Sequence, residues 1–199
     1  MHLLFLVAFA LAKPDKLLDD YVATGSPEVL RQVRVAFDTE PEGYRRRLLG
    51  ARLLFVSGDS KRALVQAEAC NREMPDDLAA YELITDIALS QREYVKAEHA
   101  AGWMLRLRAE DPRSLRAAAA VREALGDFSG AGDMLRSALA RLARTDVSIR
   151  ADLGVKLARC EAKLGRIDDA IVLLRQVERL TGTYKPATDL LRDLEGQSK

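Results

Sequence analysis

The segment Gly126-Asp127-Phe128-Ser129-Gly130-Ala131 has counterparts elsewhere in the chain. Residues 165–170 read Gly-Arg-Ile-Asp-Asp-Ala, and two earlier segments also end in an alanine that follows a Gly or an Arg by five residues. The alanines that close the four segments are Ala63, Ala97, Ala131 and Ala170. Their spacings are 34, 34 and 39 residues. The chain therefore contains an internal repeat, and a period in this range indicates a repeat architecture.

The composition of each unit predicts two helices joined by a tight turn. Glycine before the turn tolerates a positive φ that other residues avoid. A second set of small residues keeps the same register as the alanines, and small residues let two helix backbones approach closely. This second set is Ala51, Thr85, Ala119 and Ala158. Pro41, Pro75 and Pro112 stand near the ends of units, where a proline stops a helix from continuing.

The apolar residues of the second helices recur every three to four positions, which indicates one buried face for each helix. The period places five helical hairpins in the chain, and the connection between the fourth and fifth carries the residues that stretch one spacing to 39. A final helix with one polar face is expected to cap the stack. The predicted hairpins lie at 14–38, 42–74, 77–110, 112–144 and 148–182, and the capping helix lies at 186–195.

The repeated unit resembles a tetratricopeptide repeat in its length, its Gly-Asp turn, its repeated alanines and its closing proline. The resemblance covers nearly the whole chain after residue 13. The resemblance implies an all-α fold, a right-handed α-solenoid of about five such hairpins with a C-terminal capping helix, in one repeat domain at 13–199. It also implies a scaffold or adaptor that binds other proteins and is not an enzyme. The units depart from the family pattern at the early tryptophan of the first helix, where this chain has Arg47, Tyr81, Leu115 and Gly154.

Composition narrows the classes of function. The 199 residues are 48% hydrophobic and 31% charged, with a net charge of +1, so the chain can bury a core and is not of the disordered kind. Only 6% of the residues are aromatic, and a nucleic-acid binder needs a clustered basic surface and usually stacking aromatics, so we expect no nucleic acid among the partners. Cys70 and Cys160 each fall on an apolar stripe, so we expect two buried free thiols too far apart for a disulfide.

No pattern of catalytic or cofactor-binding residues is found in the sequence. After His2 the only histidine is His99, which lies off the apolar stripe of its helix. One histidine and two distant cysteines provide neither the ligands of a zinc site nor a catalytic Cys/His pair. We therefore expect that the protein binds no metal and no cofactor and is not an enzyme. A helical enzyme, for instance one acting on cell-wall material, remains an alternative that requires a cleft with convergent polar groups.

The first twelve residues differ from the rest. Leu3 to Ala12 are all apolar, Lys13 follows, and Ala10-Leu11-Ala12 has the small-x-small form of a signal-peptidase site. The run is about half the ~20 residues that span a bilayer, so no stable membrane span is expected. We therefore expect residues 1–12 to be a signal peptide and the protein to be periplasmic or secreted. The alternative is a cytoplasmic, chaperone-like binding module that retains this segment.

The family resemblance implies that a partner segment binds along a concave surface lined by the first helix of each hairpin. The residues expected on that face are Arg45, Arg52, Glu82, Asp86, Arg113, Arg116, Glu123, Lys156, Arg159 and Lys163. Seven of them are basic and three acidic, a net charge of +4 that favours an acidic segment of a protein partner. Contact is expected to be strongest at Arg113 and Arg116; the alternative is that all these charges serve solubility.

One aromatic residue on a second helix allows two interpretations. Trp103 lies beside an apolar stripe and is expected in the core between repeats or at its margin. The alternative is an exposed contact for self-association, because tryptophan is enriched in the residues that dominate interface energies.

Overall fold

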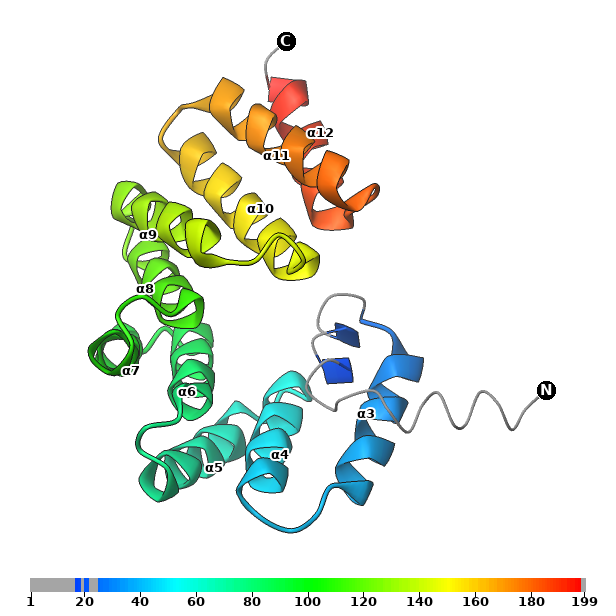
Figure 1. The fold of residues 1–199 in the computed structure, drawn as a ribbon, viewed down its shortest axis with the longest axis vertical. Coiled ribbons are helices and arrows are strands. Elements are labelled where there is room, and N and C mark those ends of the chain that lie inside the picture. The colour runs from blue at the N-terminus through cyan, green and yellow to red at the C-terminus, as the bar shows by residue number, and fades with distance from the viewer. Residues whose placement is uncertain (1–16, 19, 22–24, 198–199) are drawn as a thin grey trace, which may run out of the picture. The chain divides into compact units, whose positions relative to one another are not determined.

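The computed structural model describes residues 17–18, 20–21 and 25–197, and every regular element in them is a helix. The predicted signal segment 1–12 lies outside these residues, as does most of the first helix of the first predicted hairpin. The helices, labelled in Figure 1, are α3 (Pro27–Thr39), α4 (Tyr44–Val56), α5 (Ser60–Glu73), α6 (Leu78–Ser90), α7 (Tyr94–Leu107), α8 (Pro112–Ala124), α9 (Phe128–Arg141), α10 (Val147–Lys163), α11 (Ile167–Thr181) and α12 (Lys185–Gln197).

The chain forms two compact units, residues 1–87 and 88–199. The first contains α3, α4, α5 and most of α6, and the second contains α7 to α12. Within each unit the helices pack mainly against their neighbours in sequence: α4 on α5 in the first unit, and α7 on α8, α8 on α9 and so on to α12 in the second. Among the described helices, none is long and apolar enough to cross a membrane.

The turns between paired helices have the left-handed backbone that the repeat predicts. Gly58, Gly126 and Gly165 have φ values of +88°, +84° and +78°. The turn between α6 and α7 places Arg92 in the same conformation, with φ of +59°, and Arg92 is the one residue other than glycine with positive φ in the described chain. The aspartate after the turn then caps the second helix in two cases: the side chain of Asp59 accepts from the Arg62 N–H and that of Asp127 from the Gly130 N–H.

Both sets of repeated small residues lie where helices meet. Ala63, Ala97, Ala131 and Ala170 have no exposed surface, and the earlier set is equally buried, at no more than 1% exposure. The polar member of that set, Thr85, satisfies its hydroxyl within its own helix by donating to the Tyr81 carbonyl oxygen at 2.8 Å. The prediction that these positions mark close helix packing is confirmed.

The core of the first unit lies around α3 and α4. Leu17, Leu18, Val33 and Leu49 are buried together. The ring of Phe37 lies at the edge of this cluster, and the Arg46 guanidinium stacks over its face at 4.9 Å. These contacts bring α3 against the first described hairpin, α4 and α5.

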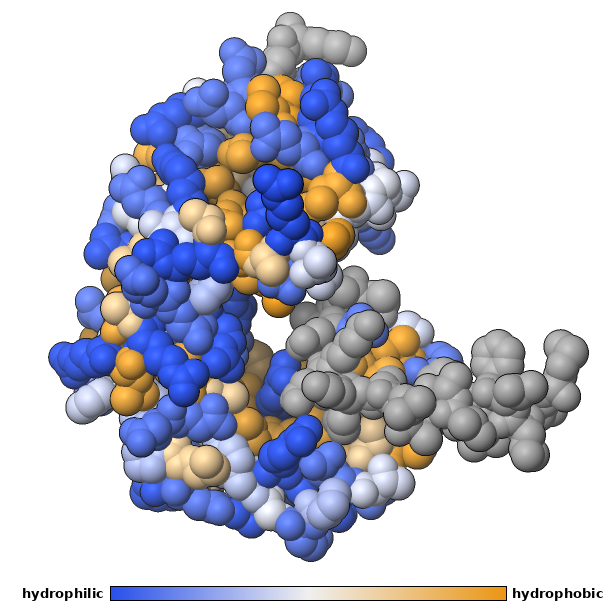
Figure 2. Space-filling view, in the orientation of Figure 1, coloured by the Kyte–Doolittle hydropathy of each residue, from blue (hydrophilic) through white to orange (hydrophobic). Residues whose placement is uncertain are grey.

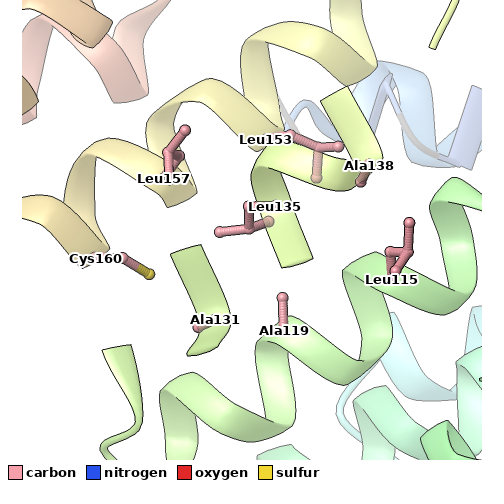
Figure 3. Close-up of a cluster of buried hydrophobic side chains, with 8 residues drawn as sticks. All are labelled: Leu115, Ala119, Ala131, Leu135, Ala138, Leu153, Leu157 and Cys160. Atoms are coloured by element: carbon pink, nitrogen blue, oxygen red, sulfur yellow. The ribbon is translucent and has the colours of Figure 1, made fainter. Parts of the chain in front are cut away.

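The core of the second unit is shown in Figure 3. Side chains from α8, α9 and α10 meet in a cluster with the fully buried Leu135 of α9 at its middle. Its members are Leu115, Ala119, Ala131, Leu135, Ala138, Leu153, Leu157 and Cys160. A second cluster joins α10, α11 and α12, and here α10 approaches α11 so closely that a Cβ on Gly154 would lie 2.6 Å from Cγ2 of Val177. Gly154 stands where the family has tryptophan, and the close approach explains the departure.

One carboxylate is buried between three successive helices. Glu161 of α10 is 5% exposed. Its Oε1 lies 3.1 Å from the Arg136 guanidinium of α9, and its Oε2 lies 2.9 Å from that of Arg166, which precedes α11. Both arginines keep nearly half of their side-chain surface exposed. The three side chains, called here the Glu161 clasp, join the hairpin of α8 and α9 to the hairpin of α10 and α11.

Candidate protein-binding surface

The first helices of two successive hairpins, α8 and α10, approach each other in the second unit. Both pack on α9, and the Arg159 guanidinium on α10 lies 3.8 Å from the Glu123 carboxylate on α8. The ion pair shows that two residues expected on one binding face do lie together. The polar faces of α8 and α10 that carry this pair are called here the α8/α10 surface.

The structure gives acidic partners to the basic residues expected on this surface. Arg113 lies 3.4 Å from Asp111, and Lys156 lies 2.9 Å from Asp152, one turn earlier on α10. Arg116 is engaged within the chain as well. Counting Asp111 and Asp152 with the predicted residues of α8 and α10 gives five basic and three acidic groups, a net charge of +2. The surface remains basic, but less so than the sequence count indicated.

Asp111 has two roles at the start of α8. Its Oδ1 accepts from the Arg113 backbone N–H at 2.8 Å, which caps the helix, and its carboxylate pairs with the Arg113 side chain. Partial burial opposes the charged form of Asp111, but these bonds outweigh burial and hold its pKa below the usual value. The ion pair with Asp111 holds the Arg113 side chain on the α8/α10 surface, where 44% of its side-chain surface stays exposed.

The remaining predicted site residues belong to α4 and α6. Arg45 pairs with Glu40 at 3.6 Å and keeps 66% of its side-chain surface exposed. Arg52, Glu82 and Asp86 are each engaged within the chain. Nearby on α4, Arg47 pairs with Glu73 of α5, and the Tyr44 hydroxyl donates to Asp77 at 2.7 Å. Burial and this bond raise the pKa of Tyr44.

The acidic partners are what sequence reasoning missed. Asp152 stands four residues before Lys156 on a predicted helix, a spacing that by itself favours an ion pair. Asp111 directly precedes Pro112, the position of a helix N-cap. Glu40 lies in the connection before α4, where no periodic pattern predicts its direction.

The exposed side of α7 carries a second cluster of interacting side chains. Trp103 is 38% exposed, at the margin of the core, and its Nε1–H donates to Nε2 of His99 at 3.2 Å. The Arg106 guanidinium stacks over the indole, 4.8 Å from its ring centre. A shallow surface hollow of about 640 Å³ lies beside them and is lined by residues 92–96 and His99. One histidine in an open hollow is not a convergent catalytic arrangement.

Both cysteines are buried free thiols in the described chain. Burial, reinforced by the nearby carboxylates of Glu123 and Glu161, raises the pKa of Cys160 to about 11. Burial likewise raises the pKa of Cys70. Neutral, enclosed thiols are poor nucleophiles and poor metal ligands. Among the residues that the structure describes, no three His, Cys, Asp or Glu side chains are grouped as a metal site.

The surface of the protein is mixed in character. The face seen in Figure 2 is mostly hydrophilic, with hydrophobic side chains exposed in scattered patches. Single exposed apolar residues are normal on a folded protein, so scattered patches do not by themselves mark a binding site.

Paired helices with left-handed turns and buried small residues at a fixed register define an all-helical repeat protein. The chain is similar in structure to TTC0263, a thermophilic TPR protein of Thermus thermophilus, with 17% sequence identity, a TM-score of 0.73 and coverage of 91% of this chain and 96% of that one. It is also similar to YrrB, a TPR protein described as having an unusual peptide-binding site, with 18% identity, a TM-score of 0.55 and coverage of 83% and 82%.

A third similar structure is MamA, from residue 41 to its end, of Desulfovibrio magneticus RS-1, with 14% identity, a TM-score of 0.56 and coverage of 84% of this chain and 92% of that one. No protein-family model matches the chain, and no curated protein matches it in sequence. The chain has the tetratricopeptide-repeat (TPR) fold, and the prediction of that fold from the sequence is confirmed.

Proposed function

We propose that this protein is an adaptor that binds a segment of another protein. The observation that carries the proposal is the TPR fold itself, with the first helices of successive hairpins presenting an exposed polar face at the α8/α10 surface. The similar protein YrrB, described as having a peptide-binding site, supports a peptide-binding use of such hairpins. Within the second unit, successive hairpins present their first helices side by side, so an extended partner can contact α8 and then α10.

The partner segment that best suits the α8/α10 surface is acidic. Arg113 and Arg159 keep 44% and 47% of their side-chain surface exposed while held by Asp111 and Glu123. A partner carboxylate can accept two parallel hydrogen bonds from such a guanidinium, and the acidic neighbours have fixed its position in advance. Lys156 on α10 extends the basic face.

Charge reversal tests the proposal. Arg113→Glu with Arg116→Glu should weaken binding of a short, fluorescently labelled acidic peptide at least tenfold and reduce the salt dependence of its affinity, as measured by fluorescence anisotropy. The matched control is Arg175→Glu with Arg192→Glu, which makes the same change in net charge on α11 and α12 and should leave the affinity within twofold. Equal losses in the two double variants would show only a general charge effect and would overturn the assignment of this surface.

We also propose that the protein works in the bacterial cell envelope after export. The apolar run from Leu3 to Ala12 and the small residues that close it support export. When the full chain is expressed in a bacterium and the cells are fractionated, a periplasmic product that begins at Lys13 is expected. A cytoplasmic product that keeps residues 1–12 would reject export and favour the chaperone-like alternative.

A further inference from the structure

The outward side of α7 presents an unusual set of residues on one face. Val95 is 83% exposed, the highest exposure of any large hydrophobic residue in the described chain. Glu98, Gly102 and Arg106 follow on the same face, each separated from the next by four residues, or about one helical turn. Trp103 lies beside them with 38% of its surface exposed. We call this set the α7 face.

Gly102 is not required by the packing of the chain itself. It sits in the middle of α7, where glycine is less favourable than alanine. Apart from its chain neighbours and the backbone of its own helix, a Cβ at this position would have no atom of the protein within 4 Å, whereas a Cβ on Gly154, in a true close approach, would clash with Val177. A bare stretch of helix backbone, flanked by exposed side chains, is suited to close approach by another backbone.

The charges on either side of Gly102 are opposite and lack ion-pair partners in the described part of the chain. Glu98 stands one turn before the glycine and Arg106 one turn after it, and eight residues of helix separate the two by ~12 Å, too far to pair with each other. Arg106 is held instead by its stack on Trp103, and the indole is held in turn by its hydrogen bond to His99. The aromatic and basic groups are therefore fixed in position before any partner arrives.

We propose that the α7 face binds the same face of a second copy of this chain, in an antiparallel pair of helices that cross at Gly102. A two-fold axis at the crossing point places each residue opposite the one that lies equally far on the other side of the glycine. Glu98 then faces Arg106 of the second copy, and Arg106 faces its Glu98, so the charge pattern is complementary to itself. Trp103 becomes covered next to the crossing point, where interface aromatics contribute most.

The resulting dimer is weak and reversible. One pair of 14-residue helices buries less than the ~1,600 Å² of a standard interface, so the dissociation constant is expected on the order of 10 to 100 μM. The dimer does not depend on the proposed peptide binding, because α7 is the second helix of its hairpin and the α8/α10 surface is formed by first helices. The Arg113→Glu/Arg116→Glu variant should therefore dimerise like the natural sequence.

The first measurement is sedimentation equilibrium of the full chain over a concentration range that extends to several hundred micromolar. Trp103 is the single tryptophan of the protein, so its fluorescence should shift to shorter wavelength over the same range as the indole is covered. A protein that stays monomeric at the highest concentration would overturn the proposal, and so would dimerisation without any change in the tryptophan emission.

Charge reversal distinguishes this dimer from other modes of association. In a homodimer of either Glu98→Arg or Arg106→Glu, both contacts between residues 98 and 106 bring two like charges together. Each variant alone should therefore self-associate about tenfold more weakly than the natural protein. An equimolar mixture of the two variants restores both opposite-charge pairs, so it should form a heterodimer with an affinity near that of the natural protein. Restored association also demonstrates that both variants are folded. Failure of the mixture to associate would refute the antiparallel arrangement.

A glycine substitution provides an independent test. Gly102→Ala should raise the thermal stability of the monomer, because alanine is the better helix former, yet weaken the dimer severalfold by keeping the backbones apart. Gly196→Ala is the matched control: this glycine also lies in a helix, α12, with open space around its Cβ position, and its substitution should leave dimerisation unchanged. A Gly102→Ala variant that dimerises as well as the control would contradict the crossing point.

Discussion

The Glu161 clasp makes a quantitative prediction about stability. Its carboxylate is 5% exposed, so its charge is tolerated only because two guanidinium groups surround it. Removing Arg136 or Arg166 alone leaves one partner, and each Ala variant should lower the free energy of unfolding by about 1 kcal/mol. This is below the ~1.5–3 kcal/mol of a hydrogen bond to a charged group, because both arginines are half exposed. Removing both Arg136 and Arg166 leaves the buried carboxylate without a partner, which costs about 3–5 kcal/mol.

The double variant should therefore lose more than the sum of the two single variants. The assay is urea denaturation followed by circular dichroism at 222 nm, with linear extrapolation to water for all variants at pH 7. Adding Glu161→Leu to the double variant should recover most of the loss, because a buried apolar side chain of similar size leaves no unpaired charge. Additive single effects, or no recovery with leucine, would refute the view that the clasp serves to neutralise a buried charge.

Three further predictions follow from individual backbone and side-chain positions. Arg92→Gly should raise the free energy of unfolding by about 1 kcal/mol by relieving a left-handed residue at φ of +59°, and Gly126→Arg should lower it by a similar amount; thermal denaturation of both variants tests this. Gly154→Ala should cost about 1–3 kcal/mol, because the new Cβ meets Val177 at 2.6 Å, and Val177→Ala in the same chain should return part of that loss in urea denaturation. Burial raises the pKa of Cys160 to about 11, so the free energy of unfolding should be constant below about pH 8.5 and should fall as the pH rises toward 11. Cys160→Ala should reduce this fall. A variant that keeps the full pH dependence would show that another group causes it.

The repeat could be predicted from the sequence because its signals are local and occur several times. Each hairpin needs a residue that accepts positive φ at the turn and small side chains where helices touch, so Gly126 and Ala131 have counterparts at a fixed spacing. The same register placed Arg92 at a glycine position. The sequence alone did not show whether the backbone keeps the left-handed conformation at Arg92, and the structure shows that it does, with φ of +59°.

The candidate site was less predictable, because its charges interact between helices. The pairing of Glu123 with Arg159, and of Arg136 with Glu161, depends on how α8, α9 and α10 are rotated about their axes, which the hydrophobic pattern fixes only approximately. Whether the α8/α10 surface holds a partner remains a prediction. The exposure of Trp103 could not be predicted for the same reason, because a small rotation of α7 about its axis moves the indole between the core and the surface.

Packing between helices that are neighbours in sequence also bears on how the chain acquires its structure. Most contacts within each unit form over short sequence separations, so little loop entropy is lost before they form, and rapid folding is expected. During synthesis each hairpin can pack as soon as the next helix has emerged, without waiting for a distant strand or terminus. If the chain is exported unfolded, the same property sets a kinetic limit, because transport must begin before the first finished hairpins become stable.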